Sequence, residues 1–120
     1  MGHQKSIQNL SDIVRQFCEA RDWDQFHTPK DLAIGVITEA AELLEHFRFQ
    51  SDEQAVALLS DPQKKEEIED ELADVFFFLL RFSQRFDIEL NRALQRKIEK
   101  IERKYPVEKA KGKNIKYTNL

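Results

Sequence analysis

Apolar residues recur along this chain at intervals of three and four positions, the spacing that places them on one face of an α-helix. The pattern predicts long helices over about residues 6–21, 29–49, 63–86 and 88–104, with a short helix over about 52–59. No segment shows the alternation of apolar and polar residues that is typical of a strand. The predicted fold class is therefore all-α, a helical bundle with four main helices.

Local signals set the expected ends of these helices. Thr28 is a good N-cap, and Pro29 follows it in the first turn, where its missing N–H costs nothing. Pro106 ends the last long helix because proline cannot continue a helix. The residues from about 106 to 120 are polar and basic, and we expect them to form an extended tail of a single domain that covers residues 1–120.

Two of the predicted helices carry pairs of acidic residues inside otherwise apolar segments. Glu39 and Glu42 lie three positions apart in one helix, and Glu71 and Asp74 repeat this spacing in the next long helix. Residues three apart share a helix face, so each pair forms a narrow acidic stripe. Beyond Asp74 the helix is apolar on nearly every side, which places this carboxylate at the edge of an expected core.

Each stripe has two interpretations. A single acidic pair is most often part of a solvated helix face, but like charges one turn apart are unfavourable and more so when partly buried. The pattern occurs twice, on helices that could pack antiparallel, so four carboxylates could converge around a cation. Oxygen ligands suit Mg²⁺, or Mn²⁺ as a second choice. A di-iron bundle would call for Glu-x-x-His motifs, and neither His27 nor His46 follows a Glu at that spacing.

Charge and composition narrow the class of protein further. The net charge of −3 argues against a general nucleic-acid binder, because Lys and Arg supply most of that affinity. Residues 39–74 hold twelve acidic and three basic side chains, whereas residues 96–116 hold nine basic and three acidic ones. This division suits a cation site together with an anion-binding segment, although solvated helix faces would also produce it.

The single cysteine, Cys18, and the absence of a long apolar run indicate the expected cellular setting. One cysteine cannot form an intrachain disulfide, and its apolar neighbours suggest that it is packed. The longest apolar run, residues 75–80, is far shorter than the roughly 18 residues that a membrane span requires. We expect a cytoplasmic protein without a membrane partner.

The acidic pairs and their flanking segments resemble a known family. The motifs "EAAE" at 39–42 and "ELAD" at 71–74 are similar to those of the MazG-like branch of the all-α nucleoside triphosphate pyrophosphohydrolases. The segments "RDWDQFHTPKDLA" at 21–33 and "KYPVEKAKGKNIKYTNL" at 104–120 resemble the dCTP pyrophosphatase type in particular. The similarity covers roughly residues 20–117.

The resemblance implies an activity, an assembly and a set of site residues. The activity would be Mg²⁺-dependent hydrolysis of a nucleoside triphosphate, dCTP or another dNTP, to the monophosphate and pyrophosphate. The assembly would be a homo-oligomer, usually a tetramer built as a dimer of dimers. The implied magnesium ligands are Glu39, Glu42, Glu71 and Asp74. The implied substrate-binding residues are Trp23, His27, Phe49 and Phe78 near the nucleoside and Lys97 near the phosphates. Ile101 stands where relatives often have Asn, so Ile101 is not expected to make a polar contact of that Asn.

Other interpretations stay open at this point. Glu45 or Glu67 could accept a proton from the attacking water, although either could equally belong to a solvated face. A helical interaction module without catalytic activity would explain the apolar helices but not the paired acids. A nucleotide-binding regulator would use the same site without turnover.

Overall fold

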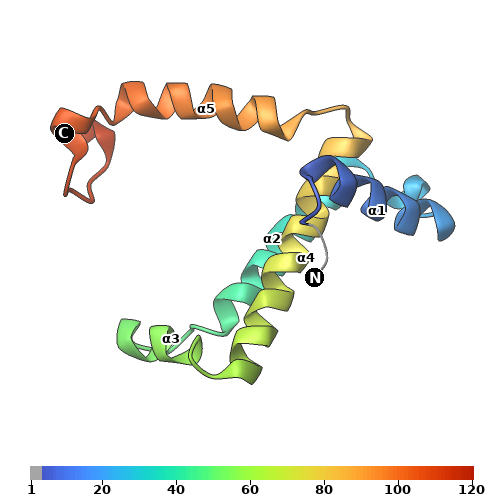
Figure 1. Ribbon diagram of the computed structural model, residues 1–120, viewed down its shortest axis with the longest axis horizontal. Coiled ribbons are helices and arrows are strands. Elements are labelled where there is room, and N and C mark those ends of the chain that lie inside the picture. The colour runs from blue at the N-terminus through green and yellow to red at the C-terminus, as the bar shows by residue number, and fades with distance from the viewer. Residues whose placement is uncertain (1–3) are drawn as a thin grey trace. The chain divides into compact units, whose positions relative to one another are not determined.

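The computed structural model describes residues 4–120, and in this part of the chain all regular structure is helical (Figure 1). The α-helices are α1 (Ile7–Ala20), α2 (Pro29–Glu45), α3 (Asp52–Leu58), α4 (Pro62–Arg85), α5 (Leu90–Lys104) and α6 (Val107–Ala110), with 3₁₀ turns η1 (Asp24–Phe26) and η2 (Tyr117–Asn119). The all-α prediction is confirmed for these residues. They form two compact units, the first ending at Asp87 and the second Ile88–Leu120. The expectation of a single domain stays a prediction.

Side-chain caps fix the starts of the first four helices. The Thr28 hydroxyl accepts a hydrogen bond from the Asp31 N–H at 3.2 Å, and Pro29 occupies the first turn of α2, as the sequence predicts. Asp61 caps α4 in the same way, ahead of Pro62. Ser6 and Ser51 form capping boxes at α1 and α3. Each of these caps joins residues two or three positions apart, so the sequence around each helix start is enough to predict it.

The end of α2 differs from the sequence-based prediction. The helix was expected to run to about residue 49, but it ends at Glu45 and residues 46–49 form turns. Phe49 adopts a left-handed backbone with φ of 67°, which an L-residue accepts only at a cost of about 1 kcal/mol. The Ser51 capping box begins the next helix two residues later, so the chain has to reverse here.

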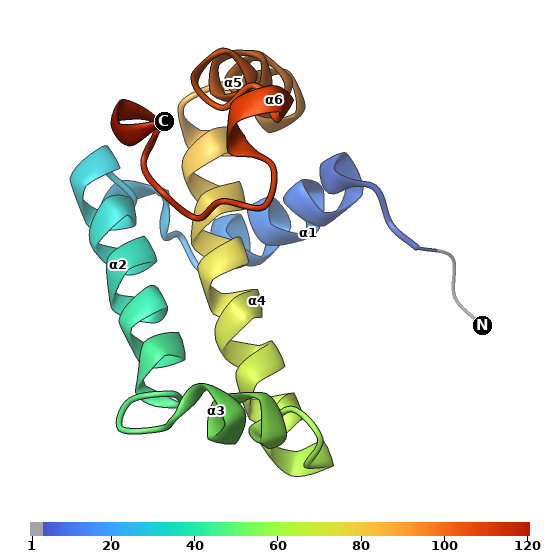
Figure 2. The same cartoon turned by 90° about the vertical axis from the view of Figure 1, so that its left-hand side faces the viewer.

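Helices α2 and α4 form the main packing pair of the first unit. They run side by side in opposite directions, joined at one end by α3 (Figure 2). Helix α1 packs against the C-terminal half of α4, where the Phe17 and Phe77 rings meet edge to face with centroids 6.1 Å apart. The buried apolar residues of the unit come from all three helices: Val14, Cys18, Leu32, Ile68 and Leu80. The expectation that Cys18 is packed is confirmed.

A glycine at the centre of the α2–α4 contact allows an aromatic ring to lie against the helix backbone. A Cβ atom at Gly35 would be 2.5 Å from both Cδ1 and Cε1 of Phe78, too close for any real contact. Glycine inside a helix costs about 1 kcal/mol relative to alanine. The close approach of Phe78 is the physical reason for a glycine at this position.

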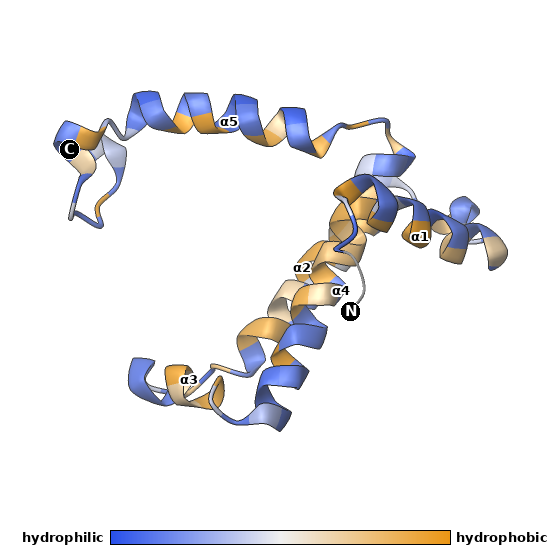
Figure 3. Ribbon diagram, viewed as in Figure 1, coloured by the Kyte–Doolittle hydropathy of each residue, from blue (hydrophilic) through white to orange (hydrophobic). Residues whose placement is uncertain are grey.

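The second unit consists of α5 and a C-terminal segment that folds back on the end of α5. Tyr105 follows α5, and its hydroxyl accepts a hydrogen bond from the Tyr117 N–H at 3.2 Å. The two tyrosine rings meet edge to face at 5.8 Å, and the Lys104 ammonium lies 4.7 Å from the Tyr117 ring. Helix α5 itself carries its apolar residues along one side (Figure 3).

The expectation of an extended tail from 106 to 120 is therefore wrong for part of this segment. Pro106 has φ of −62° and ψ of 144° and is the N-cap residue of the short helix α6, which begins at Val107. Lys116 has a similar extended conformation and precedes η2. Tyrosine packing, which composition alone does not reveal, returns the polar chain to α5.

From residue 4 onward, none of the helices combines the length and the apolar character needed to cross a membrane.

We predict that Gly35→Ala destabilises the fold only while the Phe78 ring is present. The new methyl group forces the ring to move, at a cost of about 1–3 kcal/mol in the free energy of unfolding. In a Phe78→Ala background the same substitution should stabilise the protein by up to about 1 kcal/mol, because alanine favours the helix. Urea unfolding of the four proteins of this double-mutant cycle measures both values. An equal effect of Gly35→Ala in both backgrounds would show that the ring does not depend on the glycine.

Candidate functional site

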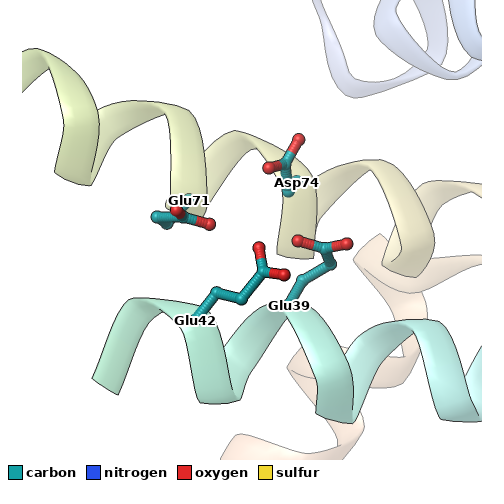
Figure 4. A group of neighbouring side chains, drawn as sticks. All are labelled: Glu39, Glu42, Glu71 and Asp74. Atoms are coloured by element: carbon teal, nitrogen blue, oxygen red, sulfur yellow. The ribbon is translucent and has the colours of Figure 1, made fainter. Parts of the chain in front are cut away.

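The four acidic residues singled out in the sequence meet between α2 and α4. Glu39 and Glu42 project from α2 and Glu71 and Asp74 from α4, so that the two pairs face each other (Figure 4). One ligand atom from each of the four residues can be chosen so that all lie within 4.8 Å of one another. The three-residue spacing puts each pair on one helix face, and the antiparallel packing of the helices brings the faces together.

The electrostatics of this cluster are unfavourable in the absence of a cation. Burial, hydrogen bonding with Glu42 and the negative charges of Glu42, Asp74 and Glu71 raise the pKa of Glu39 from its ordinary 4.5 to about 6. Oε2 of Glu71 is buried and has no hydrogen-bond partner. Its other oxygen, Oε1, lies 3.5 Å from Nε2 of His46, which follows α2. An unpartnered buried carboxylate oxygen is costly, and a bound cation would satisfy it.

The donor set fits a hard divalent cation. All four groups offer carboxylate oxygens, which Mg²⁺ and Mn²⁺ prefer over the nitrogen and sulfur ligands of softer metals. The unpartnered Glu71 oxygen and the raised pKa of Glu39 both indicate a site that lacks positive charge. Glu39, Glu42, Glu71 and Asp74 are the residues that would hold such an ion.

A cavity of about 450 Å³ lies directly beside the carboxylates, between α1 and α4. Asp74 forms part of its wall, and every other residue that lines it is apolar: Ile13, Val14, Phe17, Phe77 and Phe78. The Phe77 and Phe78 rings meet edge to face at 5.4 Å. A cavity with aromatic walls and one polar side suits a flat, partly apolar ligand group held next to the cation site.

Trp23 and His27, which the sequence analysis connected with a nucleotide, flank η1. The Trp23 ring lies 5.5 Å from Phe17, which lines the cavity, and 6.0 Å from the His27 ring. Trp23 and His27 are therefore linked to the cavity wall through Phe17, and Phe78 lies in the wall itself. Of the substrate-binding residues expected from the sequence, these three gather on the same side of the first unit.

Phe49 and Lys97 are not among the residues that line this cavity. The Phe49 side chain is 88% exposed at the end of the α2 turn, with the Arg48 guanidinium 4.6 Å above its ring. Lys97 lies on α5, in the second unit, and is exposed. The predicted roles of both residues stay predictions.

The two candidate proton acceptors are engaged in local ion pairs. Glu45 lies 3.3 Å from Arg48, and Glu67 lies 3.2 Å from Lys64, in each case three residues away in the sequence. Exposed pairs of this kind contribute little to stability and are typical of solvated helix faces. Nothing in these contacts distinguishes either glutamate as a base.

Sequence reasoning missed a buried arginine on the same face of α4. Arg81 is 1% exposed and interacts with Asp24 and His27, more than fifty residues earlier in the chain. The signal was present in the sequence, since an arginine inside the apolar run "VFFFLLRF" requires buried partners. The sequence could not show which acid supplies the partner, because Asp22, Asp24 and Asp31 were all available.

We predict that the protein without divalent cations loses stability as the pH rises from 4.5 through about 6. The folded state binds a proton at Glu39 more tightly than the unfolded state does, so deprotonation in this window favours unfolding. Adding Mg²⁺ or Mn²⁺ near neutral pH should raise the melting temperature, because the cation binds only the folded site. Thermal melts over this pH range, with chelator and then with added cation, measure both effects.

Glu39→Gln is the matched variant for these melts. It should lose most of the pH dependence between 4.5 and 6 and respond less to Mg²⁺, since the titrating ligand is gone. A Glu39→Gln protein with the same pH dependence and the same response to Mg²⁺ as the unmodified chain would contradict the assignment.

Known proteins resemble this chain both in sequence and in structure. Residues 34–120 match the model of the MazG-like family. The rat protein named dCTP pyrophosphatase 1 is 30% identical over 117 residues, which cover 98% of this chain and 69% of the rat protein, and its human counterpart is 28% identical over the same shares. A crystal structure of a pyrophosphatase from Archaeoglobus fulgidus superposes with a TM-score of 0.79 at 40% identity, covering 88% of this chain and 97% of that one. The chain belongs to the MazG-like family.

Proposed function

We propose that this protein is a Mg²⁺-dependent nucleoside triphosphate pyrophosphohydrolase. The reaction is hydrolysis of a deoxynucleoside triphosphate, dCTP or another dNTP, to the monophosphate and pyrophosphate. The observation that carries the proposal is the meeting of Glu39, Glu42, Glu71 and Asp74 at one point between α2 and α4. A structural or interaction role would give no reason to gather four carboxylates, one of which, Glu71, has a buried oxygen without a partner.

The relatives support a pyrophosphatase in particular. The mammalian relatives are named dCTP pyrophosphatase 1, and the archaeal structural neighbour is named a pyrophosphatase. The similarity to the mammalian relatives extends over 98% of this chain, so it includes both acidic pairs and the Trp23–His27 segment. Members of one family can differ in substrate, so the choice of dCTP has to be tested directly.

The residues of the chain would divide the work between binding and positioning. Glu39, Glu42, Glu71 and Asp74 would hold the cation beside the triphosphate. The role of Lys97 at the phosphates stays an expectation from the family resemblance. Mg²⁺ bound there supplies charge neutralisation and polarisation of the phosphoryl group. The cavity beside Asp74 receives the base, with Phe78 in its wall and Trp23 behind Phe17.

We predict that Glu39→Gln and Asp74→Asn each reduce pyrophosphate release from dCTP by about 100-fold or more while the helical content is retained. Each substitution removes a charged ligand from the cation site. Pyrophosphate release with Mg²⁺, Mn²⁺ or chelator measures the loss, and circular dichroism measures the helical content. Glu66→Gln, a change at an exposed position of α4, the helix of Asp74, is the control and should keep full activity.

Two outcomes of this experiment would contradict the proposal. Full activity of the unmodified protein in chelator would exclude the metal-dependent mechanism. Binding of dNTPs and NTPs without pyrophosphate release from any of them would instead favour a nucleotide-binding regulator.

We predict that Trp23→Ala raises the KM for dCTP, or lowers kcat/KM, by roughly 5- to 150-fold. Trp23 packs against Phe17, which lines the cavity, so its loss would disturb a wall against which the base is proposed to stack. Aromatic stacking on a base is worth about 1–3 kcal/mol, which sets the scale of the expected loss. Phe26→Ala is the matched control, since Phe26 is a large exposed aromatic residue of the same segment. A Trp23→Ala protein with a lower melting temperature but an unchanged kcat/KM would leave Trp23 only a structural role.

We also propose that the chain assembles as a homo-oligomer, a tetramer by resemblance to the family. In the first unit, Ile37 and Leu44 of α2 are 68% and 64% exposed, and Leu72 of α4 is 52% exposed. Packing of a second copy on these helices would bury this apolar surface. Light scattering should then give about four times the 14.2 kDa mass of one chain, and a value near that single mass at micromolar concentration would contradict the proposal.

A further inference from the structure

Arg81 lies on the face of α4 that carries Asp74 and Phe78, and it is almost completely buried. Asp74, Phe78 and Arg81 are separated by four and three residues, so they follow one another along one side of the helix. The side chain of Arg81 is 1% exposed. A buried guanidinium is stable only if its donors are paired, so its partners indicate what it is there to hold.

The partners of Arg81 lie in the Trp23–His27 segment and on its own helix. Nε donates a hydrogen bond to Nδ1 of His27 at 2.7 Å, and one terminal nitrogen donates to Asp24 Oδ1. The other terminal nitrogen donates to Oε1 of Gln84 at 2.7 Å. The Gln84 amide in turn donates to the backbone oxygen and the hydroxyl of Ser11 at 2.7 and 2.8 Å. One guanidinium therefore ties η1 to α4 and, through Gln84, α4 to α1.

The bond to His27 determines where the proton of the imidazole lies. A guanidinium can donate hydrogen bonds but cannot accept them. Nδ1 of His27 must therefore present its lone pair to Arg81, and the neutral ring carries its proton on Nε2. The hydrogen bonds of the described residues leave this Nε2–H unused, so it is available to a ligand.

The charges around His27 act in the same direction. Burial, followed by the positive charge of Arg81, lowers the pKa of His27 below its ordinary value of 6.5. Arg85, also on α4, contributes to the lowering, whereas Asp24 of η1 and Asp31 of α2 oppose it. His27 is therefore neutral at physiological pH, when it can serve as a hydrogen-bond donor through Nε2 alone.

The held segment is connected to the cavity through aromatic contacts. His27 lies 6.0 Å from Trp23, Trp23 lies 5.5 Å from Phe17, and Phe17 lines the cavity together with Asp74. A displacement of η1 would move Trp23 away from Phe17 and change the wall of the cavity. Arg81 is the only buried charged residue of residues 4–120, and it binds the Trp23–His27 segment through Asp24 and His27.

We propose that Arg81 is a positioning residue for the nucleotide: it fixes the Trp23–His27 segment beside the cavity and orients His27 so that Nε2–H donates a hydrogen bond to the substrate. The acceptor on the substrate is an oxygen or an unprotonated ring nitrogen of the nucleotide. The proposal rests on the proposed function for the identity of the ligand. The contacts of Arg81 with Asp24 and His27 are present in the protein without substrate and do not depend on the proposed function.

The tautomer of His27 is measured on the protein without substrate. In ¹⁵N-histidine-labelled protein at pH 7.5, two-bond correlations distinguish a protonated from an unprotonated ring nitrogen, and the His27→Asn spectrum identifies the His27 signals. We expect His27 to be a single neutral tautomer with the proton on Nε2. A proton on Nδ1, or an averaged pair of tautomers, would overturn the proposal before any activity is measured.

Kinetics of two variants then test the effect on the nucleotide. Arg81→Lys keeps the positive charge, but a single ammonium group cannot reproduce the planar guanidinium contacts with His27, Asp24 and Gln84. His27→Asn keeps an acceptor for Arg81 but removes Nε2–H. This variant provides the test if Arg81→Lys does not fold. We expect either variant to raise the KM for dCTP by about 10- to 100-fold, with a smaller change in kcat and an unchanged rise in melting temperature on adding Mg²⁺. Arg15→Lys, an exposed change on α1, should leave the KM unchanged.

The outcomes separate this proposal from the proposed function. If the unmodified protein releases pyrophosphate and the folded variants have its KM, the positioning role of Arg81 is wrong and the function stands. If the unmodified protein does not turn over any nucleoside triphosphate, the proposed function fails and the positioning role fails with it.

Discussion

Mutual repulsion among four carboxylates is the constraint on which the rest of this structure depends. Two antiparallel helices bring Glu39, Glu42, Glu71 and Asp74 together. Burial, a hydrogen bond with Glu42 and the neighbouring negative charges raise the pKa of Glu39 to about 6, and one buried Glu71 oxygen has no partner. The helices must therefore be held together by contacts elsewhere along their length. A bound divalent cation would turn this unfavourable point into a favourable one.

Those contacts follow the carboxylates along α4 in a regular order. One turn beyond Asp74, the Phe78 ring packs on Gly35 of α2 and forms part of the cavity wall. Three residues further on, Arg81 binds Asp24 and His27 and thereby holds η1. A single helix face thus carries the candidate ligands, the wall of the cavity and the anchor of the neighbouring segment. In this arrangement stability and the proposed binding site depend on the same residues.

The sequence was sufficient for the features that arise from local interactions. Periodicity and caps gave the all-α class and the starts of α2 and α4, and the repeated three-residue spacing gave the acidic cluster. The remaining features depend on backbone strain or on pairs of distant residues. The left-handed Phe49 that follows α2, the return of Tyr117 to Tyr105 and the partners of Arg81 involve backbone strain or residues far apart in the chain. From the sequence, a buried arginine such as Arg81 is expected to need partners, but the sequence does not show that they are Asp24 and His27.

The central claim is that the four carboxylates form a divalent cation site. It is tested most directly by titrating Mn²⁺ into the substrate-free protein and counting the bound ions by electron paramagnetic resonance. The account predicts saturable binding to the unmodified chain and binding weaker by at least about 10-fold in Glu71→Gln, because Glu71 contributes the unpartnered buried oxygen. Equal binding by the two proteins, or no binding by either, would contradict the account.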